Sequence, residues 1–226
     1  KLQKQVDFLE QNDDFSICHH NMQVFYEDKP ENTRLWNNPE QKDISTILDL
    51  ASANYISTAS CIFRNNIHNI DFEWFKNAPV GDYFLHMENA KFGKIKYFSD
   101  VMGVYRVHQN GIWEKTDKIY KIRKLIEIYD LMKTHYPQDV IEVIKNTQNK
   151  LCFDLMTEFD RDKEECRKLS IKILENNPFY ITEIKNNYLE QIRCLETELN
   201  NIYQSKAFKL SQLIRKPIFF LSKFFK

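Results

Sequence analysis

Residues 79–113, PVGDYFLHMENAKFGKIKYFSDVMGVYRVHQNGIW, decide the fold that the sequence predicts. Pro79 and Gly81 indicate a loop, and the run DYFLHMENAKFG that follows is typical of a helix beginning at Asp82. Two runs rich in β-branched and aromatic residues come next, KIKYF and VMGVYRVH, and these indicate strands. Helix and strands in this order predict a layered structure in which helices pack on a sheet.

The residues before this stretch continue the same alternation. The sequence predicts a helix over 2–11, a strand over 15–27, a polar loop over 28–41, a short helix over 44–54, a buried strand over 55–65 and a helical turn over 71–77. Helices and strands that alternate in this way predict an α/β domain over residues 1–115.

After Trp113 the pattern changes to helices alone. Apolar residues recur at helical spacing through residues 119–132, 141–159 and 166–173, which predicts a helical extension over residues 116–204. Between residues 188 and 202 the apolar spacing is 4-3-4-3, which is typical of a short coiled coil. We expect residues 181–203 to offer a surface for self-association.

The composition argues against several classes of function. The chain has 32 basic and 32 acidic residues, so the whole molecule offers no broad electrostatic attraction for nucleic acid. Its five cysteines are scattered without a C-x-x-C spacing, which argues against a zinc site or a disulfide framework and favours the cytoplasm. No apolar run reaches the ~20 residues that span a bilayer.

Asp82 is the first candidate for chemistry, because it stands where a helix is expected to begin. One interpretation is a helix cap, since Asp accepts backbone N–H bonds there and its charge is favoured at the positive helix end. The other is a general base, held rigid by the helix and facing the open end of the sheet, where α/β proteins bind ligands. The two roles are compatible.

Arg106 and His108 form a second candidate, because residues two apart on a strand leave the same face. A guanidinium beside an imidazole suits a diphosphate or its metal ion, whereas the alternative is the solvated end of a surface strand. Thr58 and Ser60 share a predicted strand face, where they would touch a ligand or else lie at the edge of the core. Further ligand contacts are expected from Gly81 and Trp113. Trp36 and Trp74 are either stacking platforms for a ligand or packed side chains.

These segments together resemble the closing half of a bacterial family 2 glycosyltransferase of the GT-A fold. In that family a helix begins at the acidic catalytic base, and a G-K-I-x-Y strand and a Y-R-x-H-x-x-G segment follow, as they do in residues 81–113. The opening KLQKQVDFLEQNDDFSICHHN is similar to the helix and strand after the family's D-x-D metal motif. STASCIFRN is similar to the strand before the acceptor side. The resemblance covers about residues 1–113.

The resemblance implies inverting transfer of a sugar from a nucleotide-sugar donor to a hydroxyl of a saccharide or lipid-linked acceptor, in the synthesis of cell-surface polysaccharide or glycoconjugate. Asp82 would be the base, and Arg106 and His108 would face the donor diphosphate with Mg²⁺ or Mn²⁺. Thr58, Ser60, Gly81 and Trp113 would contact the sugar or acceptor, and Trp36 and Trp74 would be platforms for sugar rings. The family's nucleotide-binding half and its D-x-D motif are absent from these residues. The main metal ligands are therefore expected outside this chain, which by itself should be inactive. Gly81-Asp82 stands where the family often has Glu-Asp.

A different interpretation is a non-catalytic module derived from a glycosyltransferase, which binds a membrane or a partner. The basic tail, SKAFKLSQLIRKPIFFLSKFFK at 205–226, is expected to lie on the inner face of the cell membrane, or else to pack on the helical extension. Basic residues near anionic lipid contribute about 1 kcal/mol each. The residues expected to meet the membrane are Lys206, Lys209, Arg215, Lys216, Phe219, Phe220 and Lys223.

Deleting residues 205–226 is expected to abolish binding to anionic vesicles, because it removes this cationic and aromatic surface. Co-sedimentation of the chain with and without the tail measures the effect, with vesicles of neutral lipid as the control. Equal pelleting of both forms on anionic vesicles, or pelleting of neither, would contradict a membrane role for the tail.

Overall fold

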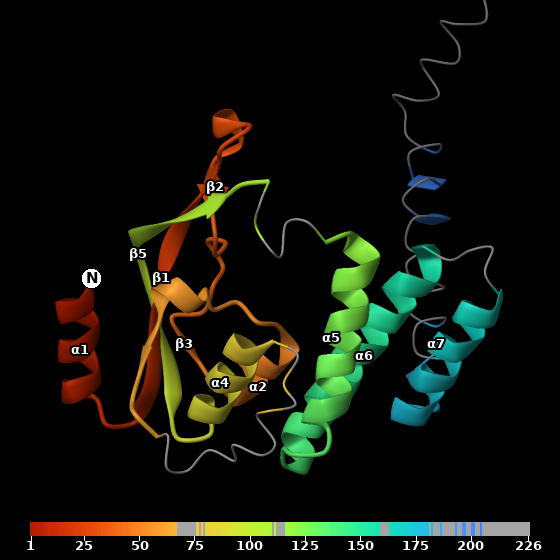
Figure 1. Cartoon of the computed structure of the whole chain (residues 1–226). Helices are drawn as coiled ribbons and strands as arrows, with labels where there is room; N and C mark the ends of the chain where they lie inside the picture. The colour runs from red at the N-terminus through yellow and green to blue at the C-terminus, as the bar shows by residue number, and fades with distance from the viewer. Residues whose placement is uncertain are drawn as a thin grey trace, which may run out of the picture. The chain divides into compact units, whose positions relative to one another are not determined.

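The computed structural model describes residues 1–66, 80–109, 116–158 and 163–180, together with single residues at 76, 78, 111, 182, 186, 193, 196, 197, 200, 201 and 204 (Figure 1). The chain divides into two compact units, Lys1–Asn177 and Pro178–Lys226. The candidate site lies in the first unit. Apart from Lys76, the helical turn predicted over 71–77 lies outside the described residues, and so does most of the predicted coiled coil.

The described elements of the first unit alternate between helix and strand up to β5 and are helical afterwards. Their bounds are α1 (Leu2–Gln11), β1 (Phe15–Tyr26), η1 (Pro30–Asn32), β2 (Arg34–Leu35), β3 (Ile44–Ser45), α2 (Ile47–Ser52), η2 (Thr58–Ser60), β4 (Ile62–Phe63), α4 (Gly81–Ala90), β5 (Lys94–Val107), α5 (Lys118–Met132), α6 (Gln138–Glu158) and α7 (Lys163–Asn176), where η marks a 3₁₀ helix.

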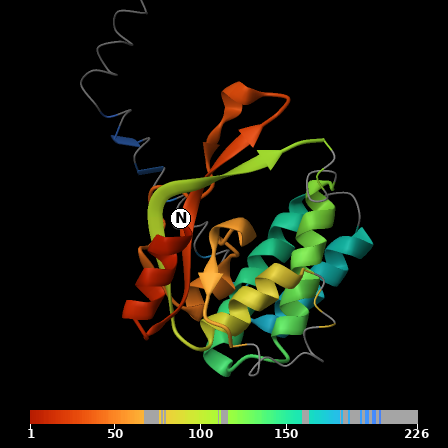
Figure 2. The same ribbon diagram turned by 60° about the vertical axis from the view of Figure 1, so that its left-hand side comes forward.

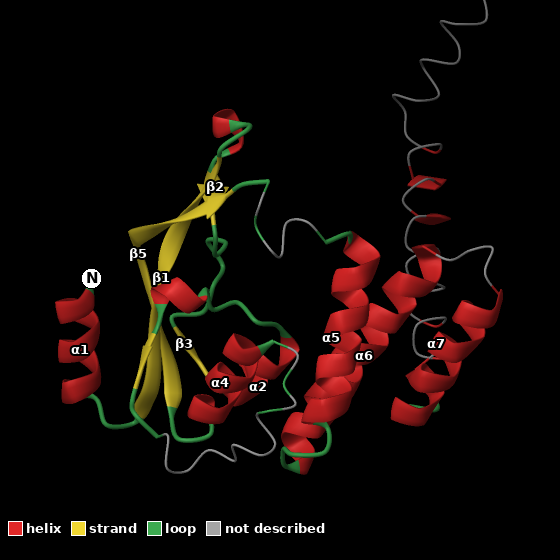
Figure 3. Cartoon of the chain, viewed as in Figure 1, coloured by secondary structure: helices red, strands yellow, loops and turns green. Residues whose placement is uncertain are grey.

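A mixed sheet is built around the long parallel pair of β1 and β5 (Figure 3). This pairing runs from Phe15 opposite Lys94 to Tyr26 opposite Val107 and is broken by register shifts near Asn21. The strand order is β2-β1-β5-β3, and β2, β3 and β4 are short strands that pair antiparallel with their neighbours. The α/β class predicted from the sequence is therefore confirmed.

Helices cover the two faces of the β1–β5 pair. Figure 1 shows α1 on one side and α2 and α4 on the other. Neighbouring β1 residues divide between two clusters, as strand geometry requires: Ile17 joins the larger core with Phe84 of α4, and Cys18 joins a smaller cluster with Leu9 of α1. Ile128 of α5 and Ile144 of α6 complete the larger core (Figure 2).

Helix α4 is fixed to its neighbours by buried polar contacts as well as by apolar packing. The fully buried carboxylate of Glu88 accepts hydrogen bonds from Tyr136 Oη at 2.8 Å and Lys91 Nζ at 3.0 Å, and His135 Nε2 lies 3.1 Å from it. Tyr83 Oη donates to the backbone carbonyl of Leu50 in α2 at 2.8 Å. Partnered in this way, a buried carboxylate holds the helix in one position.

The structure differs from the sequence prediction in several elements. Residues 55–65 form η2 and the short β4 instead of one strand, because Ser60 folds back and both its N–H and its hydroxyl donate to Ser57 O. The runs KIKYF and VMGVYRVH form one strand, β5, which ends at Val107. The loop predicted over 28–41 contains η1 and β2, and the helix predicted over 44–54 begins only after β3. In the first compact unit, which extends to Asn177, α5 and α6 share the core with the sheet.

Among the described residues, no helix is both long enough and apolar enough to cross a membrane. This finding concerns α1 to α7 and the described residues after them. The basic tail at 205–226 lies outside the described residues.

Gly93 sets how closely the start of β5 approaches β1. A Cβ atom at this position would lie 2.8 Å from Asp14 O and 2.9 Å from Ser16 N, both backbone atoms that cannot move independently of β1. Gly93→Ala is therefore expected to lower the free energy of unfolding by about 1–3 kcal/mol. Chemical denaturation measures the change.

Gly103→Ala is the matched control within the same strand. Its Cβ atom would lie 3.2 Å from Met22 Cε, the flexible end of a side chain that is able to shift. We expect the free energy of unfolding to fall clearly less than in Gly93→Ala. Equal losses in the two variants would contradict the conclusion that the missing side chain at Gly93 is what allows β5 to approach β1.

Candidate active site

The first turn of α4 holds the carboxylate of Asp82 in a fixed, partly exposed position. Its Oδ2 accepts a hydrogen bond from Thr58 Oγ1 at 2.5 Å, and its Oδ1 accepts one from the N–H of Tyr83 at 2.7 Å. Val80 occupies the N-cap position, so the strict capping interpretation of Asp82 is wrong. The residue still lies in the first turn, where the helix dipole favours negative charge.

Thr58 and Ser60 belong to the 3₁₀ turn η2 and do not share a strand face. Thr58 is exposed and reaches Asp82, whereas Ser60 is fully buried and donates to Ser57 O at 2.7 Å. The buried side chain of Gln5 donates to the carbonyl of Ser60 at 2.9 Å, which ties this turn to α1. The hydroxyl available beside Asp82 is therefore that of Thr58.

Beneath Asp82 lie buried groups that the sequence prediction missed. His86, one helical turn further along α4, is fully buried with its Nε2 3.4 Å from Cys61 Sγ. Burial lowers the pKa of His86 to about 4, although the charge of Asp82 opposes this, and burial raises the pKa of Cys61 to about 11. Both groups are therefore neutral near pH 7, and the spacing of four residues from Asp82 to His86 was the signal available in the sequence.

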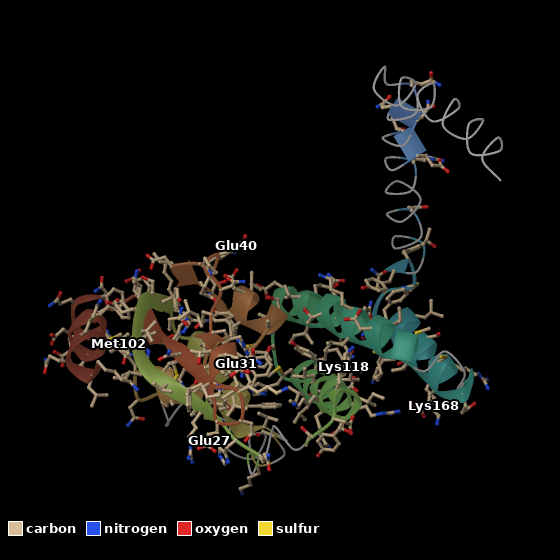
Figure 4. All side chains as sticks on the ribbon, turned by 90° about the horizontal axis from the view of Figure 1, so that it is seen from above. Glu27, Glu31, Glu40, Met102, Lys118 and Lys168 are labelled. Atoms are coloured by element: carbon tan, nitrogen blue, oxygen red, sulfur yellow. The ribbon has the colours of Figure 1, made fainter. Side chains whose placement is uncertain are left out.

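Arg106 and His108 lie at the end of β5, away from α4. Figure 1 shows α4 beside the lower half of the sheet, while β2 and the end of β5 lie in the upper half. Arg106 Nη1 pairs with Glu27 Oε1 at 2.7 Å, and both side chains are exposed; Glu27 is labelled in Figure 4. The structure thus does not bring Asp82 together with these two residues.

His108 directly follows the last residue of β5, the strand that carries Arg106. It lines a pocket of about 220 Å³ whose walls include Tyr26, Lys29 and Gln109. Gln109 Nε2 donates to Asp28 Oδ2 at 3.1 Å in the same pocket. His108 therefore lines a small hollow where β1 and β5 end.

The structure describes only some of the remaining predicted site residues. Gly81 is exposed and begins α4. Trp113, Trp74 and the predicted membrane-binding residues of the tail lie outside the described residues. Within the described part of the chain, no group of three or more His, Cys, Asp or Glu side chains is arranged to hold a metal ion.

Comparison with known proteins identifies relatives without assigned roles. Over 113 residues, half of this chain, the sequence is 32% identical to the uncharacterized protein Rv1520 of Mycobacterium tuberculosis and to the uncharacterized protein Mb1547 of Mycobacterium bovis. The match spans about a third, 32%, of the length of each of these relatives. No family model matches the chain, and no solved structure matches it.

The buried histidines predict a pH dependence of stability. Burial lowers the pKa of His86 from 6.5 to about 4 and that of His19 to about 3. Below pH 6.5 the unfolded chain therefore binds protons that the folded chain does not. The free energy of unfolding should fall as the pH is lowered from about 7 to 5, by up to ~1.4 kcal/mol per pH unit for each of these histidines.

Urea denaturation across this pH range measures the slope, and His86→Gln supplies the comparison. The variant lacks one of the titrating histidines, so its slope should be smaller by up to about one proton, whatever its absolute stability. An unchanged slope in His86→Gln would contradict the assignment of His86 as a neutral buried imidazole.

Proposed function

We propose that this chain is the acceptor-side part of an inverting glycosyltransferase of the GT-A type, which transfers a sugar from a nucleotide-sugar donor to an acceptor hydroxyl. The observation that carries the proposal is the partly exposed carboxylate of Asp82, held in the first turn of α4 by Thr58. The resemblance of residues 1–113 to the closing half of family 2 glycosyltransferases supports the same function. The acceptor is a saccharide or a lipid-linked saccharide of the cell envelope.

Asp82 accepts the proton of the acceptor hydroxyl in this proposal. The acceptor oxygen forms a bond to the anomeric carbon of the donor while the bond from that carbon to the nucleoside diphosphate breaks. The electron pair leaves with the diphosphate, the proton remains on Asp82, and the configuration at carbon inverts. Each carboxylate oxygen has two acceptor sites, so the hydrogen bonds from Thr58 and Tyr83 still leave room for the substrate hydroxyl.

Thr58 positions the base by fixing the Asp82 side chain. The short Oγ1–Oδ2 bond selects one orientation of the carboxylate before any substrate binds, which reduces the reorganisation needed for proton transfer. His86 and Cys61, the buried groups near Asp82, are neutral near pH 7, so neither carries a positive charge that would neutralise the Asp82 carboxylate. The hydrogen bonds from Thr58 and Tyr83 thus hold the Asp82 carboxylate in one orientation.

Arg106 and His108 are proposed to meet the donor diphosphate. Arg106 would have to exchange its exposed ion pair with Glu27 for the phosphate, and exposed ion pairs of this kind are weak. A divalent metal, Mg²⁺ or Mn²⁺, would supply further positive charge for the leaving group, but the described residues offer no cluster of ligands for it. We therefore assign its ligands to a donor-binding half outside these residues and derive no step through it.

Asp82→Asn is expected to lower the rate of sugar transfer by ~10²-fold or more, because the amide cannot accept the proton. The assay uses the longest protein that contains this chain and monitors product formation from a nucleotide sugar. Donor binding and the thermal unfolding temperature should stay close to those of the wild type. Near-wild-type turnover would overturn the assignment.

Asp117→Asn is the matched control for this substitution. Asp117 caps α5 by accepting the N–H of Tyr120 at 2.8 Å, and Asn is an equally good cap, so activity and stability should be unchanged. Equal losses of activity in the Asp117 and Asp82 variants would point to a general effect of losing a carboxylate.

A further inference from the structure

A second pocket, with a volume of about 330 Å³, lies between the segment that follows β2 and the segment that follows α2. Its described walls combine two aromatic residues, four amide side chains and one guanidinium. They are Trp36, Tyr55, Asn37, Asn38, Gln41, Asn54 and Arg34. None of these residues takes part in the proposed proton transfer, and the volume falls at the lower end of the range for small-molecule sites.

The walls of this pocket are held in place by hydrogen bonds between its two sides. The carbonyl of Tyr55 accepts from Trp36 Nε1 at 3.1 Å and from Asn37 Nδ2 at 3.0 Å. Behind the pocket, the backbone N–H of Asn37 donates to Asn21 Oδ1 of β1 at 3.0 Å. The ring of Trp36 also lies against that of Tyr105, with centroids 5.0 Å apart. The aromatic and amide groups are therefore in position before any ligand binds.

Two amide oxygens in the described walls lack a partner. Asn37 Oδ1 and Asn54 Oδ1 are buried and have no hydrogen-bond partner among the described residues, and Asn37 is only 4% exposed. A buried polar atom left without a hydrogen bond costs about 1–3 kcal/mol. A ligand or ordered water that donates hydroxyl hydrogens to these oxygens would recover that free energy. Both residues line the pocket, so a small movement of their side chains would expose these buried oxygens to a ligand rich in hydroxyl groups.

Amide side chains suit such a ligand, because each carries donors and an acceptor that match neighbouring hydroxyls of a sugar ring. The flat apolar face of an aromatic ring packs against the C–H face of the same ring. Arg34 is the one charged residue among the described residues of the pocket, and its guanidinium donates to Leu35 O and Tyr26 Oη. A phosphorylated ligand would need more positive charge than this.

We propose that this pocket binds an uncharged sugar ring, with Trp36 as the aromatic wall and Asn37, Asn38, Gln41 and Asn54 as the hydrogen-bonding groups. In the transferase, this ring is a saccharide unit of the acceptor, an assignment that rests on the proposed function. Tyr55 in the pocket wall and Thr58 beside Asp82 are three residues apart, so their Cα atoms lie within about 11 Å. The pocket therefore holds a part of the acceptor next to the unit whose hydroxyl reacts.

The test is a nuclear magnetic resonance titration of the full chain with methyl glycosides of common hexoses and N-acetylhexosamines, and with uridine diphosphate for comparison. At least one glycoside should cause saturable shifts of the Trp36 indole N–H and of the side-chain amides of Gln41 and Asn54. The amide of Gln109, in the separate 220 Å³ pocket, should not shift and serves as the internal control. Shifts with uridine diphosphate alone would overturn the proposal in favour of a nucleotide site.

Variants separate binding from folding. Trp36→Ala removes the aromatic wall and should abolish the shifts, but it also removes the ring contact with Tyr105 and the hydrogen bond to Tyr55 O. Asn38→Ala changes an exposed residue, so the fold should persist while affinity falls by about 5–10-fold for one lost hydrogen bond. Gln109→Ala should leave affinity unchanged. Unchanged affinity in Asn38→Ala and in a folded Trp36→Ala, or no response to any glycoside, would overturn the proposal.

The Asp82→Asn variant distinguishes this inference from the proposed function. It should bind the same glycoside with wild-type affinity, because Asp82 does not line the pocket. If Asp82→Asn binds the glycoside and transfers sugar at the normal rate, the assignment of Asp82 as the base is refuted and the assignment of the pocket stands. If Asp82→Asn loses transfer and no glycoside binds, the assignment of Asp82 stands and the assignment of the pocket is refuted.

Discussion

The parallel pairing of β1 with β5 is the constraint on which the rest of the first unit depends. The strands are separated by some seventy residues of sequence, so every element between them must fit the connection that their register allows. Gly93 lets the start of β5 approach β1 closely, and Lys94 N–H then donates to Asp14 O at 2.8 Å. Because β5 begins only a few residues after α4 ends, the close approach of β5 to β1 also restricts where α4 and its first turn lie.

The position of Asp82 follows from contacts on three sides of α4. Glu88 connects the end of the helix to Tyr136 after α5, Tyr83 connects its beginning to Leu50 of α2, and Thr58 contacts the carboxylate itself. Apolar packing alone would let a short helix slide or rotate, whereas these directional bonds allow one arrangement. The helical segment after residue 115 therefore helps to support the candidate base.

The sequence predicted the elements with a strong local signal and missed those set by tertiary contacts. The 79–113 stretch has clear helix and strand composition, and α4 and β5 form there. Residues 55–65 are also rich in β-branched and apolar residues, yet only Ile62 and Phe63 find a partner strand, opposite Cys18 and Ile17 of β1. Local composition carries no information on the availability of a partner strand, so a turn replaced the predicted strand.

The residues of the candidate site divide in the same way, into those with a local sequence signal and those set by tertiary contacts. Asp82 was identified because a helix start is readable in sequence, whereas the pairing of Arg106 with Glu27 joins residues 79 positions apart and has no local signature. Trp36 was recognised only as a residue that either packs or binds sugar. In the structure its indole N–H donates to Tyr55 O, and Trp36 also lines a pocket, so the packed position and a ligand-facing position are compatible. Only the fold reveals such a combination.

The segment between α2 and β4 links the two proposed functional features physically. Asn54 and Tyr55 form part of the pocket wall, and Thr58, a few residues later, contacts Asp82. Ile56 between them is 2% exposed and belongs to the main core, and Ser57 O anchors the turn at Ser60. The segment is therefore rigid, and a ring bound in the pocket would be held at a set distance from the carboxylate. Such positioning of the acceptor relative to the base is a large part of what an enzyme contributes to a transfer between two bound substrates.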